Sequence, residues 1–494
     1  MTSASPDLSV ARRRSELERS ASETVDVLIV GGGITGVGAA LDAASRGLSV
    51  VLIEAEDLAF GTSRFSSKLV HGGLRYLATG DFATARESAQ ERHLLMTAIA
   101  PHLIRALPQL LPLAPGLSLR QRVAGGAGMA IGDLLRLQAR TPHATLPGPR
   151  LVSRRRALDL FPALDARGLR GGMLTFDGQL VDDSRLVVSV ARTAASLGAC
   201  ILTRVRALRL RGDGALAEDA LTGERLDIRA RSVINATGVW AGSLDESITV
   251  RPSRGTHIVL DGADLGGPTA ALTIPHVGSI SRYVFALPQL SGRVIVGLTD
   301  EDAPGPVPQV SQPTEPEIAF LLDNLNRVLA TPVRRDRVLG AFAGLRPLVD
   351  SGGSSTADIS RRHLVAASDA GFVNVLGGKL TTYRRMAEDA VDLAVRLRGL
   401  SAAASRTASL RLVDSPTTGS GPTTDSGPTT GSGPLVPGIT LTRGEVESAV
   451  RAEGAMTAAD VLDRRSRVGL VDADRARLLE PVADLVAALL DEIG

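Results

Sequence analysis

The chain has 494 residues, enough for two or three domains with sizeable hydrophobic cores. Its apolar content of 44% and charged content of 22% are ordinary for a soluble globular protein. A formal net charge of +2 and an aromatic content of 3% argue against a dedicated nucleic-acid surface. Cys200 is the only cysteine, which excludes an intramolecular disulfide, a CxxC redox pair and a thiolate zinc cluster, and we expect no metal site.

The first 24 residues contain Arg12-Arg13-Arg14 but no apolar run after them, so we expect a disordered tail rather than a signal peptide. Nowhere does the chain hold about 18 consecutive apolar residues without a charge, which is the length that a membrane-spanning helix needs. These features predict a cytoplasmic protein.

Residues 25–54 predict a strand, a glycine-rich turn, a helix and a second strand. The apolar strand 25–30 stops at a G-x-G-x-x-G sequence, and the second strand ends on an acid. The glycines would let a pyrophosphate approach the backbone at the helix N-terminus, and the acid would accept hydrogen bonds from ribose hydroxyls. The segment therefore predicts dinucleotide binding. The expected contacts are Gly31, Gly33, Ile34, Thr35, Gly36 and Glu54.

Two later segments resemble further parts of the same nucleotide domain. Residues 232–238 (SVINATG) predict a strand that runs into Thr237-Gly238, and residues 371–391 predict a strand, a Gly377-Gly378 turn and a helix beginning near Lys379. This discontinuous pattern resembles the glutathione-reductase-like FAD proteins, so FAD is favoured over NAD. A helix N-terminus aimed at the flavin pyrimidine would stabilise the negative charge of the reduced cofactor.

The expected fold is α/β, with a discontinuous FAD-binding Rossmann domain over about residues 25–100, 180–245 and 335–400. An antiparallel β-sheet substrate domain would be inserted over about residues 101–179 and 246–334. Within it, β-rich segments at 254–260, 280–287 and 293–298 predict strands, and apolar residues at helical spacing predict a helix over 315–330.

Residues 103–140 combine Leu, Pro and Gly with five arginines: Arg105, Arg120, Arg122, Arg136 and Arg140. Two interpretations stay open. These residues form surface helices with solvated arginines, or they form a basic interfacial patch that lies on an anionic membrane.

The composition changes at Pro416, where PTTGSG, PTTDSG and PTTGSG follow one another. These hexads have no apolar face, so we expect a flexible linker over residues 401–439. Residues 440–494 predict a small C-terminal helical domain, with Thr442 as an N-cap.

Four motifs occur in order along the chain: SSKLVHGGLRYL at 66–77, RGTHIV at 254–259, GLRPL at 344–348 and GGKLTTYR at 377–384. Together they resemble the FAD-dependent, quinone-linked glycerol-3-phosphate dehydrogenases, over roughly residues 25–400 and weakly over 440–490. The resemblance implies oxidation of sn-glycerol 3-phosphate to dihydroxyacetone phosphate, with a hydride passing to flavin N5 and the electrons to a quinone. A homodimer and a peripheral position on the inner face of the cell membrane are compatible with it.

The resemblance also implies roles for individual residues. His257 is the expected base, because the unperturbed pKa of histidine lies near neutrality. Arg346 would lower the pKa of His257 and hydrogen-bond the developing alkoxide. Cationic and hydroxyl groups suit the substrate phosphate, and the expected clamp is Arg75, Tyr76, Arg361 and Lys379. Each has a purely structural alternative: a satisfied buried histidine, an arginine that pins a loop, or a solvated arginine.

Further cofactor contacts are implied by the same motifs, at Ser63, Ser67, Lys68, Leu69, His71, Gly72, Gly73, Ala236, Thr237, Gly238, Gly378, Lys379, Leu380 and Thr381. Two other functions are compatible with parts of the sequence. An FAD-dependent amine or 2-hydroxy-acid oxidase that uses oxygen would share the fold but lack the SSKLVHGGLRYL and GGKLTTYR motifs. A non-catalytic flavoprotein would bind a partner through its tethered helical tail.

Overall fold

The computed structural model describes residues 4–73, 81–279, 282–349, 363–414 and 433–493. The chain forms two compact units. Unit 1 comprises Met1–Arg64, Asp182–Pro252 and Arg346–Gly494, and unit 2 comprises Phe65–Val181 and Ser253–Leu345. No helix in the described part of the chain is long and apolar enough to cross a membrane.

The sheet of unit 1 has β1 at its centre, paired in parallel with β2 on one side and β10 on the other. Its strands lie in the order β17-β18-β10-β1-β2-β7, and β8 and β9 extend from β10. Their bounds are β1 Val25–Val30, β2 Val50–Glu54, β7 Cys200–Thr203, β8 Val205–Arg211, β9 Gly214–Asp219, β10 Arg225–Asn235, β17 His363–Ala367 and β18 Val373–Gly377. The strands expected at 25–30, 232–238 and 371–377 are therefore present in one sheet, as the Rossmann fold requires.

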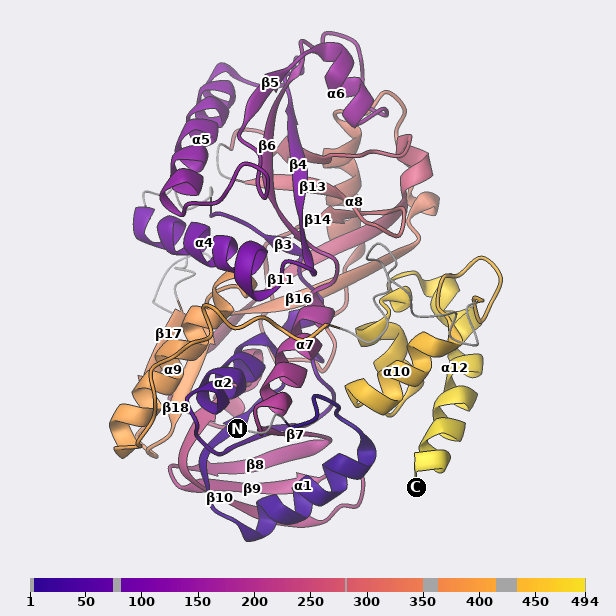
Figure 1. Cartoon of the computed structure of the whole chain (residues 1–494). Helices are drawn as coiled ribbons and strands as arrows, with labels where there is room; N and C mark the ends of the chain where they lie inside the picture. Colours follow the sequence, from indigo (N-terminus) through magenta and orange to yellow (C-terminus); the bar gives the residue numbers. More distant parts are fainter. Residues whose placement is uncertain (1–3, 74–80, 280–281, 350–362, 415–432, 494) are drawn as a thin grey trace. The chain divides into compact units, whose positions relative to one another are not determined.

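Three helices pack together over this sheet: α2 (Ile34–Ser45) lies between α7 (Asp183–Ser196) and α9 (Tyr383–Arg398) (Figure 1). Close packing depends on small residues in α2. A Cβ atom at Gly38 would lie 2.9 Å from Cδ2 of Tyr383, the first residue of α9. The sequence therefore places glycine where the two helices approach each other most closely.

The N-terminal residues correct one expectation, because Val10–Ser22 form helix α1 and not a disordered tail. The helix buries Arg13, Glu16 and Ser20. Arg13 pairs with the Asp219 carboxylate at 2.6 Å and donates to the Thr203 carbonyl at 2.8 Å. Because α1 is held by buried polar contacts with distant segments, apolar periodicity could not predict it.

Unit 2 contains a mostly antiparallel sheet in the order β15-β11-β14-β13-β12-β4-β6-β3, with β16 paired to β11 and β5 to β6. Its strands are β3 Leu69–Val70, β4 Ile104–Pro112, β5 Arg150–Val152, β6 Gly172–Leu180, β11 Val250–Asp261, β12 Ala271–Pro275, β13 Tyr283–Pro288, β14 Arg293–Gly297, β15 Glu301–Asp302 and β16 Gly340–Val349. Its helices are α4 Phe82–Leu94, α5 Leu119–Gln138, α6 Arg154–Leu160 and α8 Glu315–Asn326. The expected antiparallel substrate domain has this architecture.

The unit boundaries differ from the expected ones. Residues 65–100 were expected in the nucleotide domain, but β3 pairs with β6, so this segment joins the sheet of unit 2. Likewise, the return to unit 1 comes at Arg346 and not near residue 335. Pairing between β3 and β6 joins residues more than 100 positions apart, and local sequence does not reveal such pairs.

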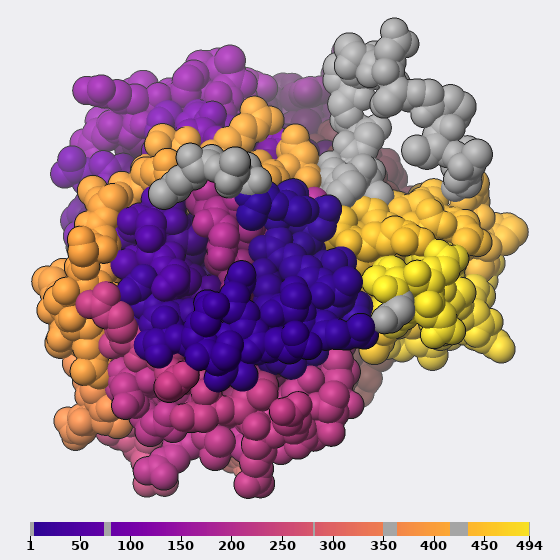
Figure 2. Space-filling model, turned by 60° about the horizontal axis from the view of Figure 1, so that its bottom comes forward, coloured from indigo at the N-terminus to yellow at the C-terminus, as the bar shows by residue number. Residues whose placement is uncertain are grey.

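The C-terminal residues form a helical segment within unit 1, with α10 Arg443–Glu453, α11 Ala458–Asp460 and α12 Asp472–Ile493. Thr442 caps α10 in a capping box with Glu445, as its sequence position predicts. The segment lies beside the N-terminal residues (Figure 2), and the Leu8 N–H donates to the Ala452 carbonyl at 3.1 Å. The hexad repeats at 415–432 lie outside the described residues.

Candidate active site

The glycine turn between β1 and α2 is closely packed against β10. Gly31 has φ +114°, and a Cβ atom there would lie 2.6 Å from the Ala236 carbonyl oxygen. A Cβ atom at Gly36 would lie 1.8 Å from the Gly31 carbonyl oxygen. Gly33 is the N-cap of α2 and supplies no side-chain cap. The turn thus presents bare backbone at a helix N-terminus, which suits a pyrophosphate.

Glu54 ends β2 directly beside this turn. Its Oε2 accepts a hydrogen bond from the Gly32 N–H at 2.5 Å, and its Oε1 accepts one from the Glu56 N–H at 2.9 Å. Burial raises the pKa of Glu54 above its ordinary value, although these two backbone hydrogen bonds oppose the shift. The carboxylate lies where a ribose-binding acid is expected.

The loop that follows Glu54, residues 56–64, folds back onto the glycine turn, and we call it the cradle loop. The Ala59 N–H donates to the Gly32 carbonyl at 3.0 Å, and Ser63 Oγ accepts from the Ile34 N–H at 2.9 Å. A Cβ atom at Gly61 would lie 2.8 Å from Trp240. The cradle loop therefore forms a wall beside the N-terminus of α2.

Two buried asparagines, which are not among the expected site residues, connect the carboxyl end of β10 to the start of β18. Thr237 Oγ1 donates to Asn235 Oδ1 at 2.7 Å, and Asn235 Nδ2 donates to Asn374 Oδ1 at 2.9 Å. Asn374 Nδ2 in turn donates to Asp245 Oδ2 at 2.6 Å. The signal in the sequence is an asparagine within each of two apolar strands, and strand pairing puts these asparagines opposite each other.

The GGK segment lies between β18 and α9. Gly377 and Gly378 have φ +72° and +67°, which are conformations that residues other than glycine rarely adopt. The Lys379 carbonyl accepts a hydrogen bond from the Thr382 N–H at 3.0 Å, and Thr381 is buried. A short turn over Leu380–Thr382 leads into α9, so the helix expected near Lys379 is present but begins at Tyr383.

These features of unit 1 fit FAD. The glycine turn and the α2 N-terminus suit its pyrophosphate, and Glu54 suits its ribose. The space where a Cβ atom of Gly238 would lie is open, which leaves room for close approach by a large planar group. The candidate contacts Gly31, Gly33, Gly36, Glu54, Ser63 and Thr237 all lie in unit 1.

In unit 2, His257 of β11 is buried with only 2% of its surface exposed. Its Nε2 lies 2.9 Å from Ser67 Oγ, and its ring stacks on Phe342 with centroids 4.8 Å apart and planes 12° apart. The opposite residue in β14 is Gly297, where a Cβ atom would lie 2.1 Å from His257 Cδ2. Only glycine at that position leaves room for the imidazole ring.

Of the expected cofactor contacts, Ser67 lies beside this histidine and Lys68 lies beside Phe342, which stacks on it. Lys68 has φ +56° and is buried, and its ammonium group lies 5.4 Å from the centre of the Phe342 ring, a cation–π contact. The resemblance implies that Ser67 contacts the cofactor, and that contact stays a prediction. The partner of Ser67 in this structure is 190 residues away, so only tertiary structure reveals the pair.

Polar contacts hold the chain just before His257 and just after His71. Arg254, the arginine of the RGTHIV motif, donates a hydrogen bond from Nε to the Glu317 carboxylate at 2.9 Å. The Gly72 N–H donates to Asp177 at 3.0 Å, and Arg92 pairs with the same carboxylate at 2.6 Å. Leu69 lies in β3, and Gly72 and Gly73 are buried.

The expected substrate residues are only partly described. Arg346 lies in β16 and Lys379 precedes the turn before α9, both half-buried. Arg75, Tyr76 and Arg361 lie outside the described residues.

Comparison with known proteins gives a family for this arrangement. Residues 26–384 match the family of FAD dependent oxidoreductases. Glycerol-3-phosphate dehydrogenase 1 of Mycobacterium tuberculosis is 50% identical over 499 residues, covering 96% of this chain and 97% of that protein. Glycerol-3-phosphate dehydrogenase 2 of the same species is 39% identical over 417 residues, covering 82% of this chain and 69% of that protein.

Two solved structures share the fold. A glycerol-3-phosphate dehydrogenase from Bacillus halodurans in complex with FAD gives a TM-score of 0.70 at 22% identity, covering 98% of this chain and 97% of that one. An L-alpha-glycerophosphate oxidase from Mycoplasma pneumoniae, with FAD bound, gives 0.59 at 20% identity, covering 79% of this chain and 99% of that one. The cofactor is FAD, and the chain belongs to the family of FAD-dependent glycerol-3-phosphate dehydrogenases.

Proposed function

We propose that this protein oxidises sn-glycerol 3-phosphate to dihydroxyacetone phosphate and uses a quinone as the final electron acceptor. The observation that carries the proposal is the 50% identity, over nearly the whole of both chains, with a protein named glycerol-3-phosphate dehydrogenase 1. The buried His257 cluster supports it, because alcohol oxidation needs a group that accepts the hydroxyl proton.

The reaction removes a hydride from substrate C2 and a proton from the C2 hydroxyl. Bound FAD supplies the hydride acceptor. His257 Nε2 takes the proton. In the tautomer that carries the ring proton on Nδ1, the Ser67 hydroxyl donates to Nε2 before substrate binds, and Nε2 can then accept the substrate proton. Phe342 and Gly297 hold the imidazole in one orientation.

The phosphate of the substrate is a dianion, which suits several cationic groups better than one. We propose Arg75, Tyr76, Arg361 and Lys379 as the clamp, and Arg346 as the donor to the developing alkoxide. Lys68 is a further cationic group of this region, and its ammonium group lies 5.4 Å from the centre of the Phe342 ring that stacks on His257.

Anaerobic titration of the purified yellow protein tests the half-reaction. Stoichiometric glycerol 3-phosphate should bleach the visible flavin absorbance, whereas glycerol or lactate should not, because neither carries the phosphate. Protein that holds FAD but is not bleached by glycerol 3-phosphate would contradict the proposed substrate. Bleaching by an amine or a 2-hydroxy acid would favour the oxidase alternative.

The acceptor is tested separately on the reduced enzyme. We expect a soluble short-chain quinone to reoxidise it at least about tenfold faster than dissolved oxygen, a difference of about 1.4 kcal/mol in barrier height. Hydrogen peroxide formed in equal amount to the ketone product would instead identify an oxidase, the activity named for the Mycoplasma pneumoniae protein.

A surface of unit 2 favours a peripheral membrane position, which we include in the proposal. Helix α5 carries an exposed apolar stripe at helical spacing, in which Leu119 and Val123 are 75% and 64% exposed and Leu134 and Leu137 are 53% and 56% exposed. Arg120, Arg122 and Arg140 flank this stripe. An apolar stripe with arginines beside it suits the boundary between anionic headgroups and acyl chains.

Vesicle sedimentation tests this surface. The protein should bind phosphatidylglycerol vesicles more tightly than phosphatidylcholine vesicles, and Leu134→Glu should weaken binding by at least about tenfold because one apolar side chain is lost from the interface. Leu221→Glu, at an exposed leucine of unit 1, is the matched control and should change nothing. Negligible binding to both lipids would exclude the membrane. Dimer dissociation in Leu134→Glu would assign the stripe to a second copy.

A further inference from the structure

The C-terminal helical segment contacts the cradle loop through a cluster of buried charges. Asp57 of the cradle loop accepts a hydrogen bond from Arg464 Nε at 2.6 Å and two from Arg465, at 2.8 and 3.0 Å. The side chains of Asp57, Arg464 and Arg465 are 1%, 4% and 2% exposed. The two arginines lie in the sequence between α11 and α12, more than 400 residues beyond their partner.

The electrostatic coupling in this cluster is strong. Burial by itself would raise the pKa of Asp57, but the charges and hydrogen bonds of Arg465 and Arg464 outweigh it and lower the pKa to about 2. The carboxylate therefore stays ionised and paired throughout the physiological range.

The segment holds both ends of the cradle loop. At the start, Arg204 connects Glu56, at 3.2 Å, to Asp460 of α11, at 2.7 Å. At the end, Arg467 donates to the Arg64 carbonyl at 2.6 Å. Between these points the cradle loop contacts the glycine turn through Ala59 and Ser63.

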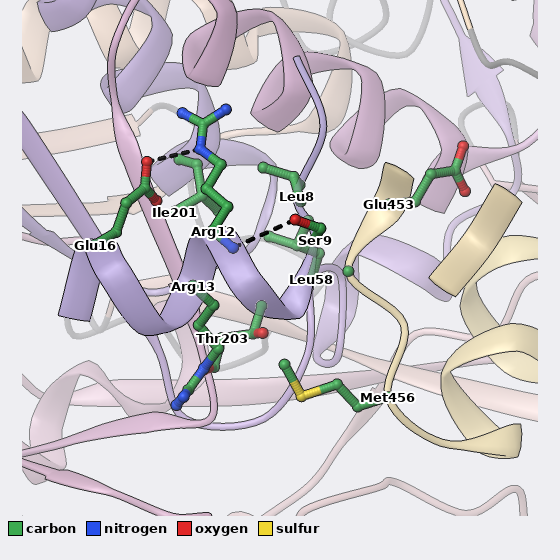
Figure 3. A pocket seen from close by; sticks show the side chains of 11 residues that line it. Leu8, Ser9, Arg12, Arg13, Glu16, Leu58, Ile201, Thr203, Glu453 and Met456 are labelled. Carbon is green, nitrogen blue, oxygen red and sulfur yellow. Dashed lines mark hydrogen bonds and ion pairs between the residues drawn. The ribbon is translucent and has the colours of Figure 1, made fainter. Parts of the chain in front are cut away.

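The N-terminal residues also contact this region, where they line a pocket together with the cradle loop and the C-terminal segment (Figure 3). The pocket is lined by Leu58 of the cradle loop, Leu8 and Ser9 before α1, and Glu453 and Met456 of the C-terminal segment. Glu453 pairs with Arg185, which donates to the Arg465 carbonyl at 2.6 Å. Three parts of the chain thus converge behind the loop that forms one wall of the cofactor site.

Buried ion pairs add little net stability compared with apolar packing, and their best-attested use is to select one arrangement. Here the selected arrangement is that of the cradle loop, which directly contacts the glycine turn. We propose that the C-terminal helical segment is a positioning element for FAD, which holds the cradle loop against the glycine turn through Asp57, Arg464 and Arg465 and thereby slows release of the cofactor.

The test is the rate at which diluted holoenzyme releases fluorescent FAD. Asp57→Asn keeps the shape of the side chain and removes its charge, and it should speed release by at least about tenfold, within the usual range of coupling between sites. The matched control is Asp42→Asn, which removes another buried carboxylate, the partner of Arg46, near the C-terminal end of α2 and so at the opposite end of that helix from the glycine turn. It should leave release within about twofold of wild type.

Release from Asp57→Asn within about twofold of wild type would overturn the proposal, and so would equal acceleration by Asp42→Asn. If Asp57→Asn does not fold, Arg467→Met decides, because it removes the bond to Arg64, together with the ion pair to Asp182, and leaves Asp57 paired. It should speed release by at least about threefold, and an unchanged rate would overturn the proposal.

Hydrogen exchange separates positioning from general stability. In Asp57→Asn, the loss of amide protection should be confined to residues 56–64 and the glycine turn. Equal loss across β1 and β10 would assign the cluster a merely structural role and overturn the proposal. Because neither readout uses glycerol 3-phosphate, failure here is distinguishable from failure of the proposed reaction.

Discussion

Asparagine in place of His257 should lower the rate of FAD reduction by glycerol 3-phosphate by about 10³-fold, within the range for loss of a general base. Asparagine approximates the polar edge of the imidazole and can still bond to Ser67, but it takes no proton near neutral pH. Because Phe342 and Gly297 define a slot for a flat ring, we expect the fold of unit 2 to survive. Stopped-flow measurement of the reductive half-reaction gives the rate directly, free of the acceptor step.

His276→Asn is the matched control. The His276 ring also packs on a phenylalanine of unit 2, with its centroid 5.3 Å from that of Phe320, and the proposed mechanism gives His276 no chemical role. It should reduce FAD at the wild-type rate. A His257→Asn enzyme that keeps a rate within about tenfold of wild type would show that the proton leaves by another route, since loss of a general base costs about 10²-fold or more. His257 would then be a structural histidine, the alternative that its position in a strand also allows.

The nucleotide-binding part of the fold was predictable because its determinants are local. The apolar strand 25–30, the spacing of Gly31, Gly33 and Gly36 and the acid at Glu54 all fall within 30 consecutive residues. Each of these features reflects a local need of the backbone, such as a tight turn or the start of a helix. The structure has that turn between β1 and α2. Where sequence separation is short, pattern and structure agree.

The features that sequence reasoning missed depend on distant partners. Helix α1 is stabilised by pairs such as Arg13 with Asp219, and its polar surface predicts a tail instead. The SSKLVHGGLRYL motif implies that Ser67 contacts the cofactor, which stays a prediction, but the motif does not reveal that Ser67 lies beside His257. The same holds for the Asn235–Asn374 pair and for Asp57 with Arg465, in which each member is an ordinary polar residue until the fold brings the two together.

Because the determinants of the glycine turn are local backbone features, we expect backbone geometry to contribute more to FAD binding than side-chain chemistry does. Gly36→Ala should weaken FAD binding by at least about a hundredfold, or about 2.8 kcal/mol. The added Cβ would lie 1.8 Å from the Gly31 carbonyl oxygen, and Gly31 is itself confined by the Ala236 carbonyl at 2.6 Å from its own Cβ position. Neither backbone segment can retreat without separating β1 from β10, so the turn must open and its N–H groups must turn away from the pyrophosphate.

Gly444→Ala provides the control, since Gly444 also lies in the first turn of a helix of unit 1 but has open space around its Cβ position. It should bind FAD normally and be slightly more stable, because alanine favours a helix over glycine. Isothermal titration of FAD into the two purified apoproteins, with circular dichroism to confirm folding, compares them. Normal FAD affinity in Gly36→Ala would mean that the turn adapts to a methyl group, and the pyrophosphate would then be held mainly by side chains such as Ser63 of the cradle loop.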